Sequence, residues 1–354
     1  LAVLAEFSAS PHIAAMRAKL AERFPESQWV EYDAMSRDNE REGLKLAFGQ
    51  ALEPTYDLTK ANVVVLLDSD LFTNHPARLR LGRDWGSGRD PESGVMNRTY
   101  AIESIYSPSG AGADHRMPLR SHQIKPFLMA LEAQVAALGA TTGTASATPK
   151  SPWLKDEKIA KWLKALSKDL VANQGKCVLF AGYGQPPEVH AITHRLNVAL
   201  GNLGTTVSYF AAANPERPTH QIALANLTKE MAAGSIDALV ILGSNPSYTA
   251  PSDVDFTAAL KKVKNSVHLA YYDDETSEFA SWHVPESHYL EHWGSNRTAD
   301  GTICIAQPLI NPLFESLSAT EMLSLMATGS RGDSKKLARE VMSEALAAQS
   351  APAA

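Results

Sequence analysis

The sequence predicts an α/β protein made of two pseudo-repeated parallel-sheet lobes of Rossmann-like type. Three observations lead to this prediction. Strand-like apolar runs alternate with helical patterns along most of the 354 residues, as in parallel α/β folds. Some runs, such as the Val and Leu residues within 61–67, are apolar almost throughout, which is typical of parallel strands buried on both faces. The alternation also restarts near Cys177, as though a second copy began there.

The first half of the chain predicts four strands and three helices. Pro11 suits the first turn of a helix because its missing N–H would have no helical partner there. Apolar residues then recur at helical spacing up to Arg23. The expected strands are residues 1–7, 28–32, 61–67 and 99–104, and the expected helices are 12–23, 40–52 and 121–138.

The second half follows a small, polar, proline-bearing stretch at residues 139–152, a composition typical of linkers. A helix is expected at 157–173, followed by strands at 177–181, 206–209, 238–242 and 267–271 and helices at 187–200, 219–233 and 256–263. The predicted organisation is a first lobe at 1–138, a linker and connecting helix at 139–174, a second lobe at 175–330, and a C-terminal helix and linker at 331–354.

An internal repeat supports the two-lobe prediction. Three pairs of positions are separated by one and the same sequence offset: Pro11 and Pro186, Asp68 and Gly243, Pro76 and Pro251. Further along, 113–118 corresponds to 280–285 at a slightly shorter offset. We infer two copies of one α/β unit, although any two such units share some strand-then-turn pattern.

Composition excludes several classes of function. A net charge of -6 lacks the basic excess that nucleic-acid binding requires. No stretch approaches the roughly 20 apolar residues of a membrane-spanning helix. Two cysteines, Cys177 and Cys304, are too few for an iron–sulfur cluster, and both are expected to be buried core thiols. The chain opens within a strand and closes in an Ala/Pro-rich tail, so we expect a piece of a longer protein.

Small polar turns follow three of the predicted strands. Asp68, Ser69 and Asp70 follow one strand, and Gly243, Ser244 and Asn245 follow its counterpart. Ligands of open α/β sheets bind at the carboxyl ends of strands, so both turns are candidate binding crevices. The stretch Gly182–Gln185 follows a third strand, and its glycines serve either an anion-binding helix start or an unusual backbone turn.

No catalytic or metal site is predicted. His190 and His194 have the spacing of a metal-binding pair, but their motif lacks the glutamate of a zinc hydrolase, and they are expected on a helix surface. The group of His283, His288 and His292 lies among tryptophans that indicate a packed loop. No nucleophile elbow, Walker loop or pair of catalytic carboxylates is present in the sequence.

Longer motifs indicate a known family. The segments 242–246, 274–276, 280–285, 290–294, 300–302 and 307–312 resemble the molybdopterin oxidoreductases. The segments 67–70, 76–84, 96–100, 113–120, 182–190, 282–285 and 288–291 more narrowly resemble the iron–sulfur subunit of the quinol-oxidising alternative complex III. The resemblance extends from residue 1 to about residue 330, with the motifs in order.

The resemblance implies a cofactor-less branch of the family. It implies a non-catalytic domain of a respiratory complex, on the periplasmic side of the bacterial inner membrane, held by partner subunits and without direct membrane insertion. Iron–sulfur clusters would belong only to a ferredoxin-like domain following this chain, and neither molybdenum nor pterin is expected within it. The vestigial crevice would comprise Ser69, Asp70, Gly182, Gly184, Gln185, Gly243, Ser244, Asn245, Glu275 and Thr276.

Two alternatives stay open. The chain could be a fragment of a catalytic enzyme that holds molybdopterin guanine dinucleotide, with a Ser or Asp as metal ligand. It could also be a general nucleotide-binding module that uses Gly182–Gln185 or Gly243–Asn245.

Overall fold

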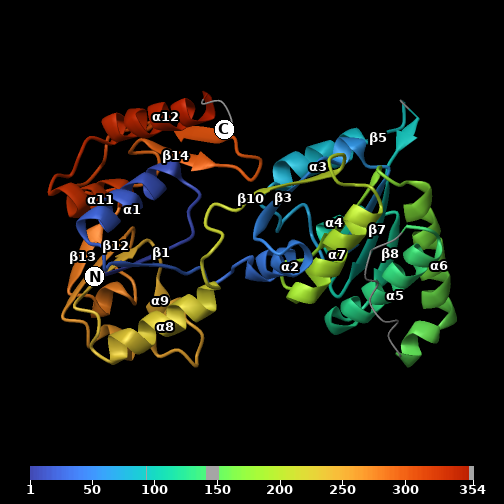
Figure 1. Ribbon diagram of the computed structural model, residues 1–354, viewed down its shortest axis with the longest axis horizontal. Helices are drawn as coiled ribbons and strands as arrows, with labels where there is room; N and C mark the ends of the chain where they lie inside the picture. Colours follow the sequence, from blue (N-terminus) through green and yellow to red (C-terminus); the bar gives the residue numbers. More distant parts are fainter. Residues whose placement is uncertain (93, 141–150, 351–354) are drawn as a thin grey trace. The chain divides into compact units, whose positions relative to one another are not determined.

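A computed structural model describes residues 1–92, 94–140 and 151–350, and it confirms an α/β fold with parallel sheets (Figure 1). The chain divides into two compact units. Unit 1 comprises Leu1–Ser36 and Arg217–Ala354, and unit 2 comprises Arg37–Glu216. Each unit has a parallel sheet of its own.

Unit 1 is built on a five-stranded parallel sheet with strand order β13-β12-β11-β1-β2. Its strands are β1 (Ala2–Ala5), β2 (Gln28–Glu31), β11 (Ala238–Leu242), β12 (Asn265–Ala270) and β13 (Trp282–Pro285). Its helices are α1 (Pro11–Arg23), α8 (His220–Ala232), α9 (Pro246–Thr249), α10 (Phe256–Leu260), α11 (Ala319–Thr328) and α12 (Ser334–Ser350). A separate antiparallel hairpin joins β14 (Gly294–Arg297) to β15 (Ile303–Ala306).

Helices cover both faces of this sheet. Val3 and Val240 face α1 and α11, where Met16, Leu20 and Leu323 complete the core. The alternate strand residues face α8 and α10, and Leu4 packs there with Leu227 and Phe256. Because successive strand residues point to opposite faces, a fully apolar strand such as β1 serves both layers.

Unit 2 has a four-stranded parallel sheet with strand order β8-β7-β4-β9. Its strands are β4 (Val63–Leu67), β7 (Arg98–Glu103), β8 (His115–Pro118) and β9 (Cys177–Ala181). Its α-helices are α2 (Asp38–Phe48), α3 (Arg78–Ser87), α4 (Pro108–Ala111), α5 (Ile124–Ala137), α6 (Glu157–Ala172) and α7 (Pro187–Ala199). Two antiparallel ribbons pair β3 (Leu52–Tyr56) with β10 (Val207–Ala211), and β5 (Arg89–Asp90) with β6 (Val95–Met96).

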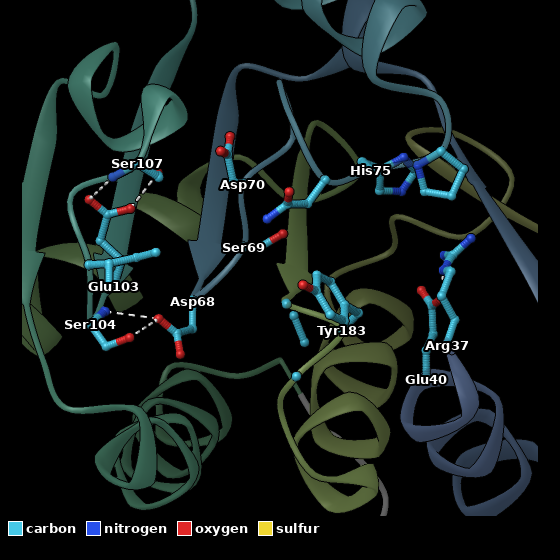
Figure 2. Close-up of a pocket in the computed structure, with 16 residues that line it drawn as sticks. Arg37, Glu40, Asp68, Ser69, Asp70, His75, Glu103, Ser104, Ser107 and Tyr183 are labelled. Carbon is cyan, nitrogen blue, oxygen red and sulfur yellow. Dashed lines mark hydrogen bonds and ion pairs between the residues drawn. The ribbon is translucent and has the colours of Figure 1, made fainter. Parts of the chain in front are cut away.

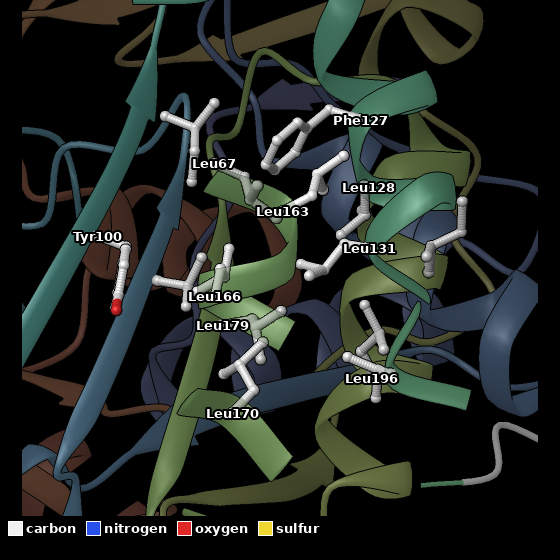
Figure 3. Close-up of a cluster of buried hydrophobic side chains, with 14 of the residues drawn as sticks. Leu67, Tyr100, Phe127, Leu128, Leu131, Leu163, Leu166, Leu170, Leu179 and Leu196 are labelled. Carbon is white, nitrogen blue, oxygen red and sulfur yellow. The ribbon is translucent and has the colours of Figure 1, made fainter. Parts of the chain in front are cut away.

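The larger core of unit 2 lies between its sheet and α5, α6 and α7 (Figure 3). Phe127 and Leu131 of α5 and Leu166 of α6 are fully buried against Leu67 and Leu179 of the strands. The opposite face of the sheet packs on α3 and on the β3–β10 ribbon. Strands β4, β7 and β9 are therefore buried on both faces, and for β4 this is what its apolar composition predicts.

The internal repeat is present in the structure. Strand β11 follows β4 at the same sequence offset that separates Pro11 from Pro186. Strand β12 follows β7 at the slightly shorter offset that separates residues 113–118 from residues 280–285. The pairing register is also shared, because Val63 lies opposite Arg98 and, at the equivalent positions, Ala238 lies opposite Asn265. The two sheets are thus copies of one strand arrangement.

The predicted division into lobes at 1–138 and 175–330 differs from the division in the structure. Strand β1 pairs with β11 of the second half, and β9 pairs with β4 of the first half. The first strand of each sequence repeat therefore lies in the sheet formed mainly by the other repeat: β1 in unit 1 and β9 in unit 2. The alternation of apolar runs and helical patterns predicts where strands lie but not which strands pair. The lobes were therefore predicted as contiguous segments, whereas in the structure they interleave.

The predicted connecting segment at 139–174 is another correction. Residues 141–150 lie outside those that the structure describes, but α6 is an integral part of unit 2, and its Leu163, Leu166 and Leu170 are buried in the core. The expected C-terminal helix is present as α12, which continues to Ser350, into the stretch expected as linker. Among the described residues, no helix combines the length and apolar composition needed to cross a bilayer.

Two local predictions also change. The helix expected at 40–52 ends earlier, at Phe48, and is followed by Gly49 in the left-handed conformation (φ 75°). Leu52, the last residue of the expected helix, instead begins β3. Cys177 is buried as expected, but Cys304 is exposed. Its strand β15 belongs to a two-stranded hairpin, and so small a sheet does not bury the side chains of its strands.

Candidate functional site

A pocket of about 230 Å³ lies at the carboxyl ends of β4, β7 and β9 in unit 2 (Figure 2). Of the predicted crevice residues, Ser69, Asp70, Gly182 and Gly184 line it. The opposite wall carries Arg37, Glu40 and His75, which the sequence did not single out. The structure thus brings two of the predicted turns together at the edge of the sheet where ligands of α/β proteins bind.

The Asp68 carboxylate links the three strand ends that form the pocket floor. It accepts hydrogen bonds from the Ser104 N–H and hydroxyl (both 2.8 Å), from the Ser121 hydroxyl (2.8 Å) and from Nε2 of Gln185 (2.9 Å). Asp68 has φ 53°, the only non-glycine residue described with positive φ. Gly182 is required beside it, because a Cβ there would lie 1.8 Å from the Asp68 carbonyl oxygen.

The other carboxylates of the pocket wall also have hydrogen-bonding partners. Burial disfavours ionisation of Asp70, but hydrogen bonds from the Ser109 hydroxyl (2.5 Å), the Thr73 hydroxyl and the Phe72 N–H (3.1 Å) outweigh it and lower its pKa. Glu103 accepts from the Ser107 hydroxyl (2.6 Å) and pairs with Arg116 at 2.5 Å. These groups are pre-positioned by the protein itself.

The opposite wall holds a buried ionic group. The Arg37 guanidinium pairs with the Glu40 carboxylate. Burial works against ionisation of Glu40, yet Arg37 and the neighbouring histidines keep its pKa below the ordinary value. Burial, with Arg37 as the next cause, lowers the pKa of His75 to about 4, so this imidazole is neutral at pH 7.

Glu40 also meets the two histidines of α7. The ligand atoms of Glu40, His190 and His194 all lie within 4.8 Å of one another. His190 and His194 are 1% and 2% exposed, so the expectation of helix-surface histidines is wrong: α2 covers that face of α7. No local pattern signals this group, because Glu40 belongs to a helix that is distant along the chain. The second histidine group of the sequence consists of His283, His288 and His292, and it forms no such cluster within the described residues.

The crevice residues of unit 1 cluster as well. Gly243 adopts φ 79° after β11, and Asn245 lies between Glu275 and Thr276. Nδ2 of Asn245 donates to Glu275 over 2.7 Å, while its Oδ1 accepts from the Thr276 hydroxyl at the same distance. The buried Ser244 presents its carbonyl oxygen to Nε2 of His268 (2.9 Å). Their role as a binding site stays a prediction.

Neither strand-end cluster suits a dinucleotide pyrophosphate. The pocket of unit 2 is lined by Glu40, Asp68, Asp70 and Glu103, against Arg37, which is already paired with Glu40. In unit 1, Glu286 lies near Gly243, and Glu275 lies beside Asn245. Anion sites in α/β folds use free N–H groups and cations, which carboxylates at the same positions oppose.

Comparison with solved structures places the chain in a known fold. No family model matches the sequence, and a search of curated proteins finds no relative. Acetylene hydratase from Pelobacter acetylenicus, a molybdopterin enzyme, matches with a TM-score of 0.65 and 11% identity over 92% of this chain. This chain spans about half (55%) of the hydratase's length. The likeness concerns the fold alone, and it agrees with the α/β fold that the sequence resemblance implies.

A second solved structure matches over nearly its whole length. It is a chain from the formyltransferase/hydrolase complex (FhcABCD) of Methylorubrum extorquens, determined in complex with methylofuran, with a TM-score of 0.58 and 15% identity. The match covers 98% of this chain and 92% of that chain. The whole of this chain, with its interleaved units, therefore has a counterpart in the fold of a single subunit.

Proposed function

We propose that this chain is a non-catalytic structural domain of a multi-subunit complex, with a fold like that of molybdopterin enzymes but without a site for their dinucleotide. The observation that carries the proposal is the carboxylate-lined pocket at the strand ends of unit 2. Asp68, Asp70 and Glu103 occupy the edge of the sheet where a cofactor's phosphates would need donors. Their own hydrogen bonds fix them in that position.

The carboxylates at these strand ends would repel a cofactor's phosphates. Two like unit charges about 5 Å apart repel by roughly 3 kcal/mol at an effective dielectric constant of about 20. A pyrophosphate placed among these carboxylates would meet several such repulsions, whereas Arg37 already pairs with Glu40. The donors that bind Asp68, namely Ser104, Ser121 and Gln185, would have to leave it to reach a ligand.

Partner subunits are the second part of the proposal. A fold counterpart of nearly equal length is a chain of a multi-subunit complex, which supports a similar setting here. Leu309, Leu313 and Phe314 lie close together along the chain in unit 1, and each is more than 70% exposed. Exposed apolar groups concentrated in this way are typical of surfaces that contact another protein.

The identity of the complex is the finest part of the proposal and rests on the sequence resemblance. We propose a respiratory quinol-oxidising complex of the alternative complex III type, on the periplasmic face of the inner membrane. In it, a ferredoxin-like iron–sulfur domain would follow this chain.

The test is the molybdenum and pterin content of the chain, purified from a bacterial host that makes the cofactor. A catalytic molybdopterin enzyme produced in the same host is the positive control. We expect a folded protein with neither molybdenum nor pterin in stoichiometric amount. About one molybdenum per chain would overturn the proposal and favour the catalytic alternative.

A second arm tests the nucleotide-binding alternative. A ligand that binds only the folded state raises the melting temperature, so a thermal-shift series with guanine nucleotides detects binding at either strand-end cluster. We expect no shift at millimolar nucleotide. A saturable rise that Gly184→Asp abolishes would instead identify the Gly182–Gln185 turn as a nucleotide site.

A further inference from the structure

Two helices of unit 2 bring together a set of metal-ligating side chains. Glu40 lies in the first turn of α2, and His190 and His194 lie one turn apart on α7. Their ligand atoms are mutually within 4.8 Å. We propose that Glu40, His190 and His194 form a binding site for a divalent transition-metal ion of the zinc class, which ties α2 to α7.

The close contact between the helices is built into the sequence. Gly43 of α2 faces α7, and a Cβ at this position would lie 2.4 Å from Cβ of His190 and 2.6 Å from the Pro187 carbonyl oxygen. Only glycine allows this approach. Because residues four apart share one face of a helix, both histidines are directed at the same part of α2.

The His194 imidazole is oriented as a metal ligand usually is. Nδ1 of His194 hydrogen-bonds the Tyr209 hydroxyl at 2.9 Å, which leaves Nε2 as the ligand nitrogen. A metal-bound histidine typically has its second nitrogen held in this way. In His190, Nε2 is buried without a hydrogen-bond partner among the described residues.

An unpartnered nitrogen at this depth needs an explanation. His190 is 1% exposed, and buried polar atoms in folded proteins almost always have a partner. A metal ion bound to Nε2 would supply that partner. The same ion would also engage His194 and Glu40, whose ligand atoms lie beside this nitrogen.

The charge states also suit a metal ion. Burial lowers the pKa of both histidines, that of His194 to about 4, so both are neutral at pH 7 and present a lone pair. Despite its burial, Glu40 keeps a lowered pKa and is ionised. Two neutral imidazoles and one carboxylate form a ligand set of zinc and related ions.

Arg37 already forms an ion pair with Glu40, and this pair leaves room for a metal ion. The Arg37 guanidinium contacts Oε2 of Glu40, and a carboxylate has a second oxygen that can bind a metal. Glu40 also lines the strand-end pocket, so one of the three ligands borders an open cavity although both histidines are buried.

The test uses the whole chain with any affinity tag removed and bound metal stripped by a chelator. Zn²⁺ is titrated calorimetrically, and Co²⁺ is added as a coloured probe of the coordination geometry. We expect one ion per chain, a higher melting temperature with Zn²⁺, and a visible Co²⁺ spectrum that Zn²⁺ abolishes. Absence of saturable binding of either ion overturns the proposal.

Three variants assign the ligands: Glu40→Gln, His190→Asn and His194→Asn. Asparagine retains a polar group near the Nδ1 position but removes Nε2, so the contact with Tyr209 is preserved as far as possible. Each variant is expected to bind Zn²⁺ at least roughly tenfold more weakly, since even outer partners of metal ligands contribute that much. Circular dichroism of the metal-free proteins shows that each variant is folded.

His75→Asn is the matched control. This residue is another buried histidine of the same pocket, its Nε2 also lacks a partner among the described residues, and it lies outside the three-residue cluster. Zn²⁺ affinity is expected to stay within about threefold of the parent. Full affinity in His190→Asn, or loss of binding in His75→Asn alone, would overturn the assigned ligand set.

Discussion

Nε2 of Gln185 donates a hydrogen bond of 2.9 Å to Oδ2 of Asp68, and this bond joins the loops that follow two adjacent strands from different halves of the sequence. Asp68 receives three further hydrogen bonds from Ser104 and Ser121. The strand-end pocket of unit 2 is thus built around one carboxylate that only accepts.

Asp68→Asn should lower the free energy of unfolding by about 1–2 kcal/mol, because the amide group turns one acceptor into a donor facing Nε2 of Gln185. Asparagine also tolerates the positive φ of this position, so backbone strain is not the cause. The measurement is urea unfolding followed by circular dichroism. Asp253→Asn, at an exposed position, is the control, and an equal effect of both variants would contradict this assignment.

The interleaved strands predict which part of the chain each core substitution loosens. Leu4 of β1 and Leu179 of β9 are both fully buried, and either change to Ala should cost about 2–5 kcal/mol. Leu4→Ala should increase hydrogen exchange in β11 and β12, and Leu179→Ala in β4 and β7. The opposite pattern would mean that the halves fold as contiguous lobes.

Two helical glycines should respond in opposite directions to alanine. Gly43→Ala places a Cβ 2.4 Å from Cβ of His190 and should lower the melting temperature by separating α2 from α7. Gly86 in α3 has no atom within 4 Å of its added Cβ, so Gly86→Ala should stabilise by about 0.5–1 kcal/mol. Thermal unfolding of both variants tests this contrast, and destabilisation by both would contradict it.

Glu286 makes stability depend on pH near neutrality. Burial, helped by repulsion from Glu6, raises its pKa from 4.5 to about 7. The folded state therefore binds this proton more tightly, so the contribution is present below about pH 4.5 and is lost as the pH rises through about 7. Glu286→Gln should flatten the fall in melting temperature between about pH 5 and pH 8.

Glu275→Gln is the control for that experiment. Glu275 is an exposed carboxyl of the same strand-end cluster, and its hydrogen bond from Asn245 lowers its pKa rather than raising it. The variant should keep the parent's pH slope above about pH 5. A parent protein whose melting temperature is constant over this range would exclude the raised pKa of Glu286.

The two thiols should react at very different rates. Cys304 is exposed, whereas Cys177 is buried and burial raises the pKa of its thiol to about 12. A disulfide reagent should modify one thiol per folded chain quickly and the second only after unfolding, because the thiolate is the reactive form. Cys304→Ala should abolish the fast phase, and rapid loss of two thiols would contradict the burial of Cys177.

Much of the fold was predictable from local pattern. Val63–Leu67 and Ala238–Leu242 are apolar runs whose composition indicates parallel strands, and the sequence offset between them, shared with the paired prolines, predicts the repeat. The turns after these strands were also identified from short polar residues. These features depend on neighbouring residues, which is why pattern reveals them.

Contacts between segments that are far apart in the sequence could not be predicted from local pattern. Strand β1 next to β11, α6 inside the core of unit 2 and Glu40 beside His190 all depend on contacts between segments far apart in the chain. The exposure of Cys304 depends on how little structure covers its hairpin. None of these has a local signature.

The sequence by itself determined the α/β class, the strands and the repeat, because burial on two faces of a sheet demands a recognisable run of apolar residues. Only the tertiary structure decided that the halves exchange their first strands and that Asp68, Asp70 and Glu103 crowd one strand-end pocket. It also decided that a glutamate of α2 meets two histidines of α7. The physical reason is that pairing and side-chain clustering are set by packing between distant segments, on which local periodicity carries no information.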